Sequence, residues 1–362
     1  MAMLSHPSYH LYLLYRGCLP GYERVGPAAI VLLAIVRLLQ GLSVGGQLMS
    51  SLVFTLERHP ASKWGLYGSY VMAAANLGTL LGGVVATVIR RTLSEEALYS
   101  WGWRIPFLSG ILVSISGFYL KRHGEEDALG HGAPTNSEAN PIQLAFSRSN
   151  IRSLLASSLV PLVWSSGFYL TFVWMAVYMT DLIENPVPNA FAVNSASLAF
   201  SLCLLFPGAG WLSDKFGRKK VMGVGGIAFG VSSPLMIKLI DSGQSSSAFV
   251  AQMFMGVSLS FWGAPMCAWL AESFEPAARL TSVSIGYNIA QAFGGGMAPA
   301  IATEMVDRLG PQSPGYYITI VAFISLVGLC FVAPRKPVHF QILQQNEQPT
   351  DSNIPLGDQE LT

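Results

Sequence analysis

The chain has 362 residues, of which 51% are hydrophobic and only 11% are charged. A soluble domain carries about 25% charged residues, so this composition indicates a membrane protein. The formal net charge of +1 provides no strong basic field, which argues against nucleic acid as a partner.

The chain contains about nine apolar runs whose length suits a bilayer core, where about 30 Å of hydrocarbon takes about 20 helical residues. Backbone N–H and C=O groups cannot stay unpaired in lipid, so runs of this length are predicted to be helices. We therefore expect an all-α, polytopic, multi-pass membrane bundle. The predicted spans are residues 26–56, 65–89, 103–120, 153–179, 190–212, 221–240, 247–271, 281–305 and 316–332.

Polar segments divide the chain into five predicted parts. Residues 122–151 are rich in Gly, Ser, Asn and Pro and are predicted to be a linker between three spans and six. Residues 336–362 are polar and are predicted to be a disordered tail. The parts are a remnant segment 1–25, an incomplete first half 26–121, the linker, a six-helix half 152–335 and the tail.

Lys and Arg are concentrated in alternate connections, which predicts the orientation of the chain. Positive residues favour the cytoplasmic side, so the linker and the C-terminus are predicted to be cytoplasmic. Arg90 and Arg91 fall on the outer side and are the exception. The expected location is the plasma (or inner) membrane.

The sequence shows no pattern that would hold a metal or a cofactor. The six histidines have no H-x-x-x-H or H-E-x-x-H spacing, and the cysteines have no C-x-x-C spacing. A Walker motif is also missing from the sequence, which argues against ATP-driven pumping. We therefore expect no metal, no cofactor and no enzymatic activity.

One local pattern occurs twice, after the first and after the seventh predicted span. Each copy has an acid at the inner end of a helix, a Pro-Ala turn, and a base three residues after the proline. The copies are Glu57, Pro60 and Lys63, and Glu272, Pro276 and Arg279. Parallel repeats build the two halves of one large class of transporter, although charged proline turns are also common by chance.

Residues 210–220, GWLSDKFGRKK, form the most specific pattern in the chain. Gly217 lets the chain reverse where a side chain would clash. Asp214 can accept hydrogen bonds from free N–H groups at a helix start, and Arg218 and Lys219 offer donors to acidic helix ends. The alternative interpretation is a basic turn on the cytoplasmic side of the membrane with no further role. The pattern resembles the G-x-L-S-D-x-x-G-R-[KR]-[KR] loop of the major facilitator superfamily, in which Gly210 is the first residue.

A second block, RLLQGLSVGG at residues 37–46, is similar to the R-x-x-Q-G-x-x-x-G-G pattern of that superfamily's fourth helix. Residues 65–69, 101–107 and 286–289 add to the similarity. Together they resemble the metabolite:proton symporter family, whose members carry proline and betaine, 2-oxoglutarate, citrate or shikimate. The resemblance covers about residues 19–334 and implies alternating-access symport of a small organic acid or zwitterion with protons.

Two departures from the family pattern affect this expectation. The family has twelve helices, and the predicted spans match its fourth to twelfth, so an N-terminally truncated form is expected. Where the family has Gly-Gly-Glu, this chain has Gly45, Gly46 and Gln47. A carboxylate can carry a proton and an amide cannot, which puts proton coupling at this position in doubt. The alternative function is a truncated, non-transporting major facilitator-like membrane protein.

The resemblance implies a gating group at the inner ends of the helices, in which Arg218 should approach Glu272. Glu57, the equivalent acid of the first half, is expected to pair with Arg58 or Lys63. The predicted gating residues are Gly210, Asp214, Gly217, Arg218, Lys219, Glu272 and Arg279.

Polar residues inside or near the spans are candidates for a substrate or proton pathway. A charge at the position of Arg37 costs at least about 2.5 kcal/mol in the bilayer, so it is a functional candidate by default. For any one of the others, packing between helices is the more common role. The candidates are Arg37, Gln40, Gln47, Tyr169, Asn194, Tyr287 and Asn288. An aromatic box for a quaternary ammonium is a further possibility, weighed against packing, at Trp164, Tyr169, Trp174 and Tyr178.

Overall fold

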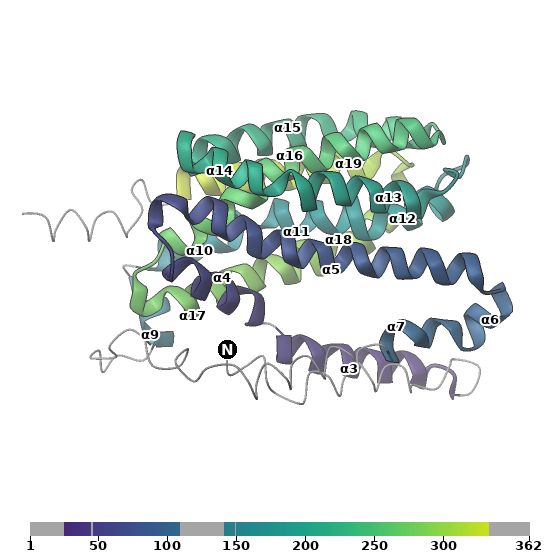
Figure 1. The fold of residues 1–362 in the computed structure, drawn as a ribbon, viewed down its shortest axis with the longest axis horizontal. Helices are drawn as coiled ribbons and strands as arrows, with labels where there is room; N and C mark the ends of the chain where they lie inside the picture. Colours follow the sequence, from purple (N-terminus) through teal and green to yellow (C-terminus); the bar gives the residue numbers. More distant parts are fainter. Residues whose placement is uncertain (1–24, 45, 109–140, 149, 333–362) are drawn as a thin grey trace, which may run out of the picture.

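The computed structural model describes residues 25–44, 46–108, 141–148 and 150–332. Within these ranges the chain forms helices and no strand, and the long helices lie side by side in one bundle (Figure 1). The prediction of an all-α membrane bundle is therefore confirmed. Predictions for residues 1–24, 122–140 and 336–362 fall outside the described residues.

Six helices among the described residues are long and apolar enough to cross a membrane. Each of them matches one of the predicted spans, because a run of apolar residues in lipid can satisfy its backbone only as a helix. The six are Ala61–Thr92, Ile151–Leu182, Ala190–Phe216, Arg218–Asp241, Ser245–Glu272 and Ser313–Val332.

The predicted span 26–56 is divided rather than continuous. It forms α3 (Ala28–Val44) and α4 (Gln47–Glu57), which are separated at Gly46. Glycine costs about 1 kcal/mol in a helix interior relative to alanine, so a glycine pair is a natural place for the helix to end. In Figure 1, α3 lies apart from the bundle, whereas α4 lies against it.

The predicted span 281–305 is also divided. It forms α17 (Pro276–Ala290), the π-turn η8 (Gln291–Gly296) and α18 (Ala298–Leu309). Three consecutive glycines in η8 weaken the regular helix here. Most of the predicted span 103–120 lies outside the described residues, which include only its beginning in α7 (Ile105–Leu108).

Several of the long helices are built from shorter segments with π-turns between them. Helix 151–182 contains α10 (Ile151–Leu159), α11 (Leu162–Phe168), η5 (Tyr169–Trp174), α12 (Met175–Val177) and η6 (Tyr178–Leu182). Helix 190–216 contains α13 (Ala190–Leu198), η7 (Ala199–Leu204) and α14 (Phe206–Phe216). The remaining elements include η2 (Ala61–Lys63), α5 (Trp64–Thr92), α6 (Glu95–Ser100), η3 (Gly102–Arg104), α9 (Pro141–Ala145), α15 (Arg218–Asp241), α16 (Ser245–Glu272), α19 (Ser313–Val327) and η9 (Gly328–Val332).

Helix α16 lies at the centre of the core, since every residue from Trp262 to Glu272 is buried. Helix α15 instead exposes a stripe of large apolar side chains at Val224, Ile227, Val231 and Leu235. In a membrane such a stripe faces lipid, where exposed apolar surface has no cost.

Helices α5 and α14 approach each other closely at a pair of glycines. A Cβ atom added at Gly65 would lie 2.5 Å from the carbonyl oxygen of Gly210 and 2.5 Å from the Ser213 Oγ. A Cβ at Gly210 would lie 2.5 Å from the Ser69 Oγ. Because real Cβ atoms do not come so close to backbone oxygens, the two helices can meet here only where side chains are lacking.

We predict that Gly210→Ala lowers the stability of the protein by about 1–3 kcal/mol, because the added methyl group forces α5 and α14 apart. The measurement is the midpoint of thermal unfolding in detergent. Gly208→Ala is the matched control, since a Cβ at Gly208 meets nothing within 4 Å. Equal midpoints for the two variants would contradict the prediction.

Candidate functional site

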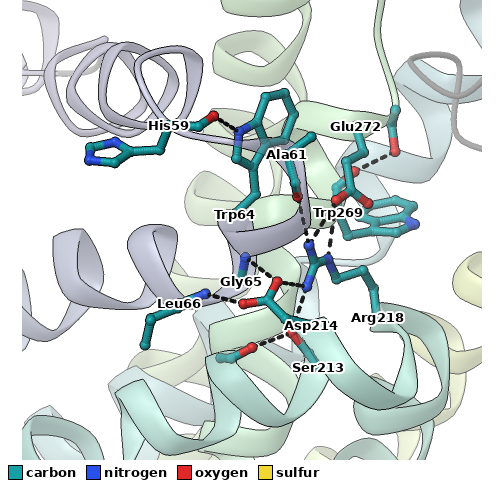
Figure 2. Close-up of polar contacts among 12 residues, drawn as sticks. His59, Ala61, Trp64, Gly65, Leu66, Ser213, Asp214, Arg218, Trp269 and Glu272 are labelled. Atoms are coloured by element: carbon teal, nitrogen blue, oxygen red, sulfur yellow. Dashed lines mark hydrogen bonds and ion pairs between the residues drawn. The ribbon is translucent and has the colours of Figure 1, made fainter. Parts of the chain in front are cut away.

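Asp214 links the end of α14 to the start of α5. Its carboxylate oxygens accept hydrogen bonds from the backbone N–H groups of Gly65 and Leu66, each at 2.9 Å (Figure 2). These N–H groups lie in the first turn of α5, where an α-helix has no partners of its own, and the N-cap residue Lys63 supplies no side-chain bond. Asp214 therefore caps a helix that lies about 150 residues away in sequence and complements the positive end of its dipole.

Arg218 binds Asp214 and begins α15 directly after the turn at Gly217, where φ is +95°. Together with Glu272, these two residues form a charge cluster. The Arg218 guanidinium donates to Asp214, to the Ser213 Oγ at 3.1 Å and to the Glu272 Oε1 at 3.1 Å. It also reaches the carbonyl oxygen of Ala61 at 3.5 Å. The expected approach of Arg218 to Glu272 is present (Figure 2).

The Arg218–Glu272 pair is largely removed from solvent. The exposed fractions of the two side chains are 12% and 6%. Charges at such a depth are retained only where hydrogen bonds satisfy both partners, and Arg218 meets this condition through its four acceptors. Removal of Arg218 would leave Glu272 as an uncompensated buried charge, whereas removal of Glu272 would leave Arg218 paired with Asp214.

The predicted partner of Glu57 was wrong. Glu57 does not rely on Arg58 or Lys63, because its Oε1 accepts a hydrogen bond from the Arg279 Nη1 at 2.7 Å. Arg279 is only 3% exposed and also donates through Nε to the carbonyl oxygen of Ala271. Its guanidinium lies 5.2 Å from the ring of Trp64. Sequence reasoning missed this pairing because α4 and α17 become neighbours only in the folded bundle.

At one end of the bundle, the Glu57–Arg279 ion pair and the bonds of Asp214 and Arg218 connect helices before the linker with helices after it. Asp214 and Arg218 contact α5 and the turn before it, and Arg279 contacts the end of α4. Segments before residue 109 are thus bound to segments after residue 150 by charge-assisted hydrogen bonds. Such bonds can hold this end of the bundle closed. Lys219 follows Arg218 on α15 and is half-buried.

Four of the pathway candidates lie in the six-helix part of the chain. Asn194 on α13 donates through Nδ2 to the carbonyl oxygen of Phe172 at 2.9 Å. Tyr169 begins η5 and is half-buried, and Tyr287 on α17 is 4% exposed. Asn288 is exposed on the same helix.

The other three candidates lie on α3 and α4. Arg37 is exposed, and its Nη1 lies 3.4 Å from the Oε1 of Gln40. Gln47 is half-buried at the start of α4. In the described part of the chain, α3 lies apart from the helices that carry Tyr169 and Asn194 (Figure 1). The structure therefore does not bring Arg37 and Gln40 together with the candidates of the six-helix part.

The aromatic residues of helix 151–182 pack against their neighbours rather than forming a common box. The ring of Trp164 lies 5.4 Å from that of Phe206. Trp174 donates to the Thr303 Oγ1 at 2.9 Å, and the Tyr178 hydroxyl donates to the carbonyl oxygen of Pro311 at 2.7 Å. These contacts favour the packing role.

Gln252 is a residue that sequence reasoning missed. It is fully buried on α16, and its Nε2 donates to the Asn194 Oδ1 and to the carbonyl oxygen of Thr171, both at 2.8 Å. A lone amide in an otherwise apolar 28-residue helix was the available signal.

Two family models match the chain in its two parts. The model described as Major Facilitator Superfamily matches residues 186–353, and the model described as Sugar (and other) transporter matches residues 18–121. The chain is similar to the major facilitator superfamily. The predicted resemblance is therefore confirmed, and the expectation that the chain is not an enzyme is confirmed because the matching family and relatives are transporters.

Relatives and solved structures agree with this resemblance. A Haemophilus influenzae protein named for metabolite transport is 29% identical over 335 residues, covering 88% of this chain and 74% of that protein. The proline/betaine transporter of Salmonella typhimurium is 28% identical over 326 residues, covering 86% of this chain and 64% of that one.

Among solved structures, the proton:xylose symporter XylE gives a TM-score of 0.67 at 16% identity, covering 94% of this chain and 82% of XylE. The fucose:proton symporter FucP of E. coli gives 0.61 at 12% identity, covering 92% and 84%. At these identities the likeness shows the major facilitator fold.

We predict that Arg218 and Glu272 are energetically coupled by about 1–3 kcal/mol, as expected for two buried charges in one network. The measurement is a double-mutant cycle with Arg218→Gln and Glu272→Gln, using the midpoint of unfolding by denaturing detergent. Neutral substitutions are required because a carboxylate at position 218 would lie beside Asp214 and confound a charge reversal.

The matched control is the exposed pair Arg308 and Glu304, whose side chains are 76% and 58% exposed. Its coupling should stay below about 0.5 kcal/mol because solvent screens both charges. Additive effects of the two substitutions at Arg218 and Glu272 would mean that the pair does not interact.

Proposed function

We propose that this chain transports a small zwitterionic metabolite or organic acid by alternating access, in symport with protons. The observation that carries the proposal is the cluster of charged residues in which Asp214, Arg218 and Arg279 bind segments on the other side of the predicted linker. The relatives named for proline and betaine or metabolite transport support the substrate class. The proton symporters with the same fold support the coupling ion.

Alternating access requires that each end of the bundle opens in turn. Opening this end of the bundle separates α4 and α5 from α14, α15 and α17. It therefore breaks the hydrogen bonds from Gly65 and Leu66 to Asp214 and the bond from Arg279 to Glu57. Charge-assisted hydrogen bonds of this kind contribute about 1.5–3 kcal/mol each. A substrate that binds one state more tightly than the other can therefore shift the equilibrium between the closed and open states of this end. The proposed gate consists of Gly210, Asp214, Gly217, Arg218, Lys219, Glu272 and Arg279.

The proposed pathway runs past Tyr169, Asn194 and Tyr287, with Arg37, Gln40, Gln47 and Asn288 as further candidates. Gln47 can donate to or accept from a substrate, but its amide cannot exchange a proton with the pathway. Proton coupling therefore requires another titratable group.

The proposed setting is the plasma or inner membrane, with the gate, the linker and the C-terminus on the cytoplasmic side. The basic residues that begin α15 support this orientation through the positive-inside preference. The lipid bilayer is then a partner of the exposed apolar stripe on α15, and nucleic acid is not a partner. The domain division into residues 1–25, 26–121, 122–151, 152–335 and 336–362 is part of the same proposal.

We predict that proteoliposomes containing the protein accumulate radiolabelled betaine, proline, citrate or 2-oxoglutarate, and that an inward proton gradient stimulates this uptake. Asp214→Asn should reduce the rate at least about tenfold, because it removes the charge that binds Arg218. Glu304→Gln is the control and should leave uptake unchanged. A folded protein that accumulates none of the four substrates would contradict the proposal and favour a non-transporting membrane protein.

The orientation makes a separate prediction. In a cysteine-free background, Ser242→Cys should react with an impermeant thiol reagent added to intact cells, and Lys220→Cys should react only after permeabilisation. Both positions are exposed at opposite ends of α15. Labelling of Lys220→Cys in intact cells would reverse the proposed orientation.

A further inference from the structure

The π-turn η5 (Tyr169–Trp174) lies near the middle of helix 151–182. A π-turn shifts backbone bonding from the i→i−4 to the i→i−5 pattern, and such turns occur frequently at functional sites. Two carbonyl groups inside this turn, those of Thr171 and Phe172, accept hydrogen bonds from side chains on other helices. In a hydrocarbon environment without water, such side-chain donors help to satisfy backbone oxygens at an irregular turn.

The donors are the side-chain amides of Gln252 on α16 and Asn194 on α13. Gln252 Nε2 bonds the Thr171 oxygen and the Asn194 Oδ1 at 2.8 Å each, and Asn194 Nδ2 bonds the Phe172 oxygen at 2.9 Å. The two amides therefore bind each other and tie three helices together at one level of the bundle. We call this pair the amide clamp.

The face of α16 that carries Gln252 is shaped for this contact. Gly256, one turn further along, leaves room for the ring of Phe172, since a Cβ there would lie 2.8 Å from the Phe172 Cζ. Ser260, another turn along, donates through Oγ to the carbonyl oxygen of Ser201 at 2.8 Å, in the second π-turn η7. One face of α16 thus supports two π-turns in two neighbouring helices.

The π-turn determines which side chains of helix 151–182 face α17 and α18. At its start, the ring of Tyr169 lies over η8, where a Cβ on Gly295 would be 2.9 Å from the Tyr169 Cε2. At its end, Trp174 bonds to Thr303 on α18. An α-helix turns by about 100° per residue, and a π-turn accommodates one extra residue. Tyr169 and Trp174 therefore meet η8 and α18 together only while the π-turn is present.

We propose that Gln252 and Asn194 are positioning residues of the transport pathway. Their amide clamp stabilises the π-helical bonding of η5 and so fixes the Tyr169 ring over the glycines of η8. The clamp also has unused bonding capacity. The Oε1 of Gln252 and the Oγ1 of Thr171 are buried and have no protein partner within the described residues. These two oxygens can therefore accept new hydrogen bonds when helix 151–182 changes its bonding pattern. This role rests on the proposed transport function, with Tyr169 in the pathway.

The first experiment tests the clamp without using transport. Amide hydrogen exchange of the full chain in lipid nanodiscs is followed in peptides that cover residues 169–177 and 199–205. Gln252→Leu removes both hydrogen bonds that the Gln252 amide donates while it keeps the side-chain volume, and it should speed exchange in residues 169–177 by about tenfold. Ser260→Ala is the matched control on the same face of α16 and should affect only residues 199–205.

The second experiment tests positioning through uptake kinetics. Gln252→Leu and Tyr169→Ala should each raise KM several-fold more than they lower kcat, and the double variant should be no worse than the more severe single variant. Exchanging the two amides, with Gln252→Asn and Asn194→Gln together, keeps both donor groups and should restore part of the loss. Ser233→Ala, a buried serine on α15 outside the clamp, should leave KM unchanged.

The two experiments separate the possible failures. Unchanged exchange in residues 169–177 of Gln252→Leu would overturn the clamp. Faster exchange with an unchanged KM, or additive effects of Gln252→Leu and Tyr169→Ala, would reduce the clamp to a structural contact and overturn the positioning role. A wild-type protein that accumulates no substrate would overturn the proposed function, while the exchange result would still decide whether the clamp holds η5.

Discussion

The carboxylate of Asp214 serves two neighbours at once, the unpaired N–H groups that begin α5 and the guanidinium of Arg218. It reaches the first because Gly65 and Gly210 let α5 and α14 approach to backbone contact. It holds the second in place between Ser213 and Glu272. Without this contact, α5 would lose its cap and Arg218 would keep only Glu272 as a counter-charge, so the position of the segment 61–92 relative to the six-helix part depends on it.

The two copies of the acid-proline-base pattern meet at the same end of the bundle, but each acid finds its partner elsewhere than in its own copy. Glu57 pairs with Arg279 from the second copy, and Glu272 pairs with Arg218 from the motif at residues 210–220. Crossed pairing makes this end sensitive to the relative movement of the two parts. A rigid-body rotation of the six-helix part would keep the Glu272–Arg218 pair, whereas the Glu57–Arg279 pair joins the two parts and must break.

Backbone satisfaction explains the polar residues inside the spans. Side chains from neighbouring helices bond carbonyl groups of π-turns at several places: Gln252 and Asn194 in η5, Ser260 and Asn76 in η7, Ser166 in η8 and Arg152 in η9. The same residues therefore combine a structural requirement of the bilayer with the means to stabilise one helical bonding pattern over another.

The sequence by itself determined the all-helical membrane class, six of its nine predicted spans and the resemblance to the major facilitator superfamily. An apolar run in lipid has only one way to satisfy its backbone, and residues 210–220 form a specific local pattern. The sequence also predicted the approach of Arg218 to Glu272, since both residues belong to family motifs. The tertiary structure alone decided the partner of Glu57, because Arg279 lies more than 200 residues away in sequence. It also decided the break at Gly46, the π-turns and the role of Gln252. Periodicity and composition describe a regular helix, whereas π-turns and buried amides depend on which neighbouring helix supplies the missing hydrogen bond.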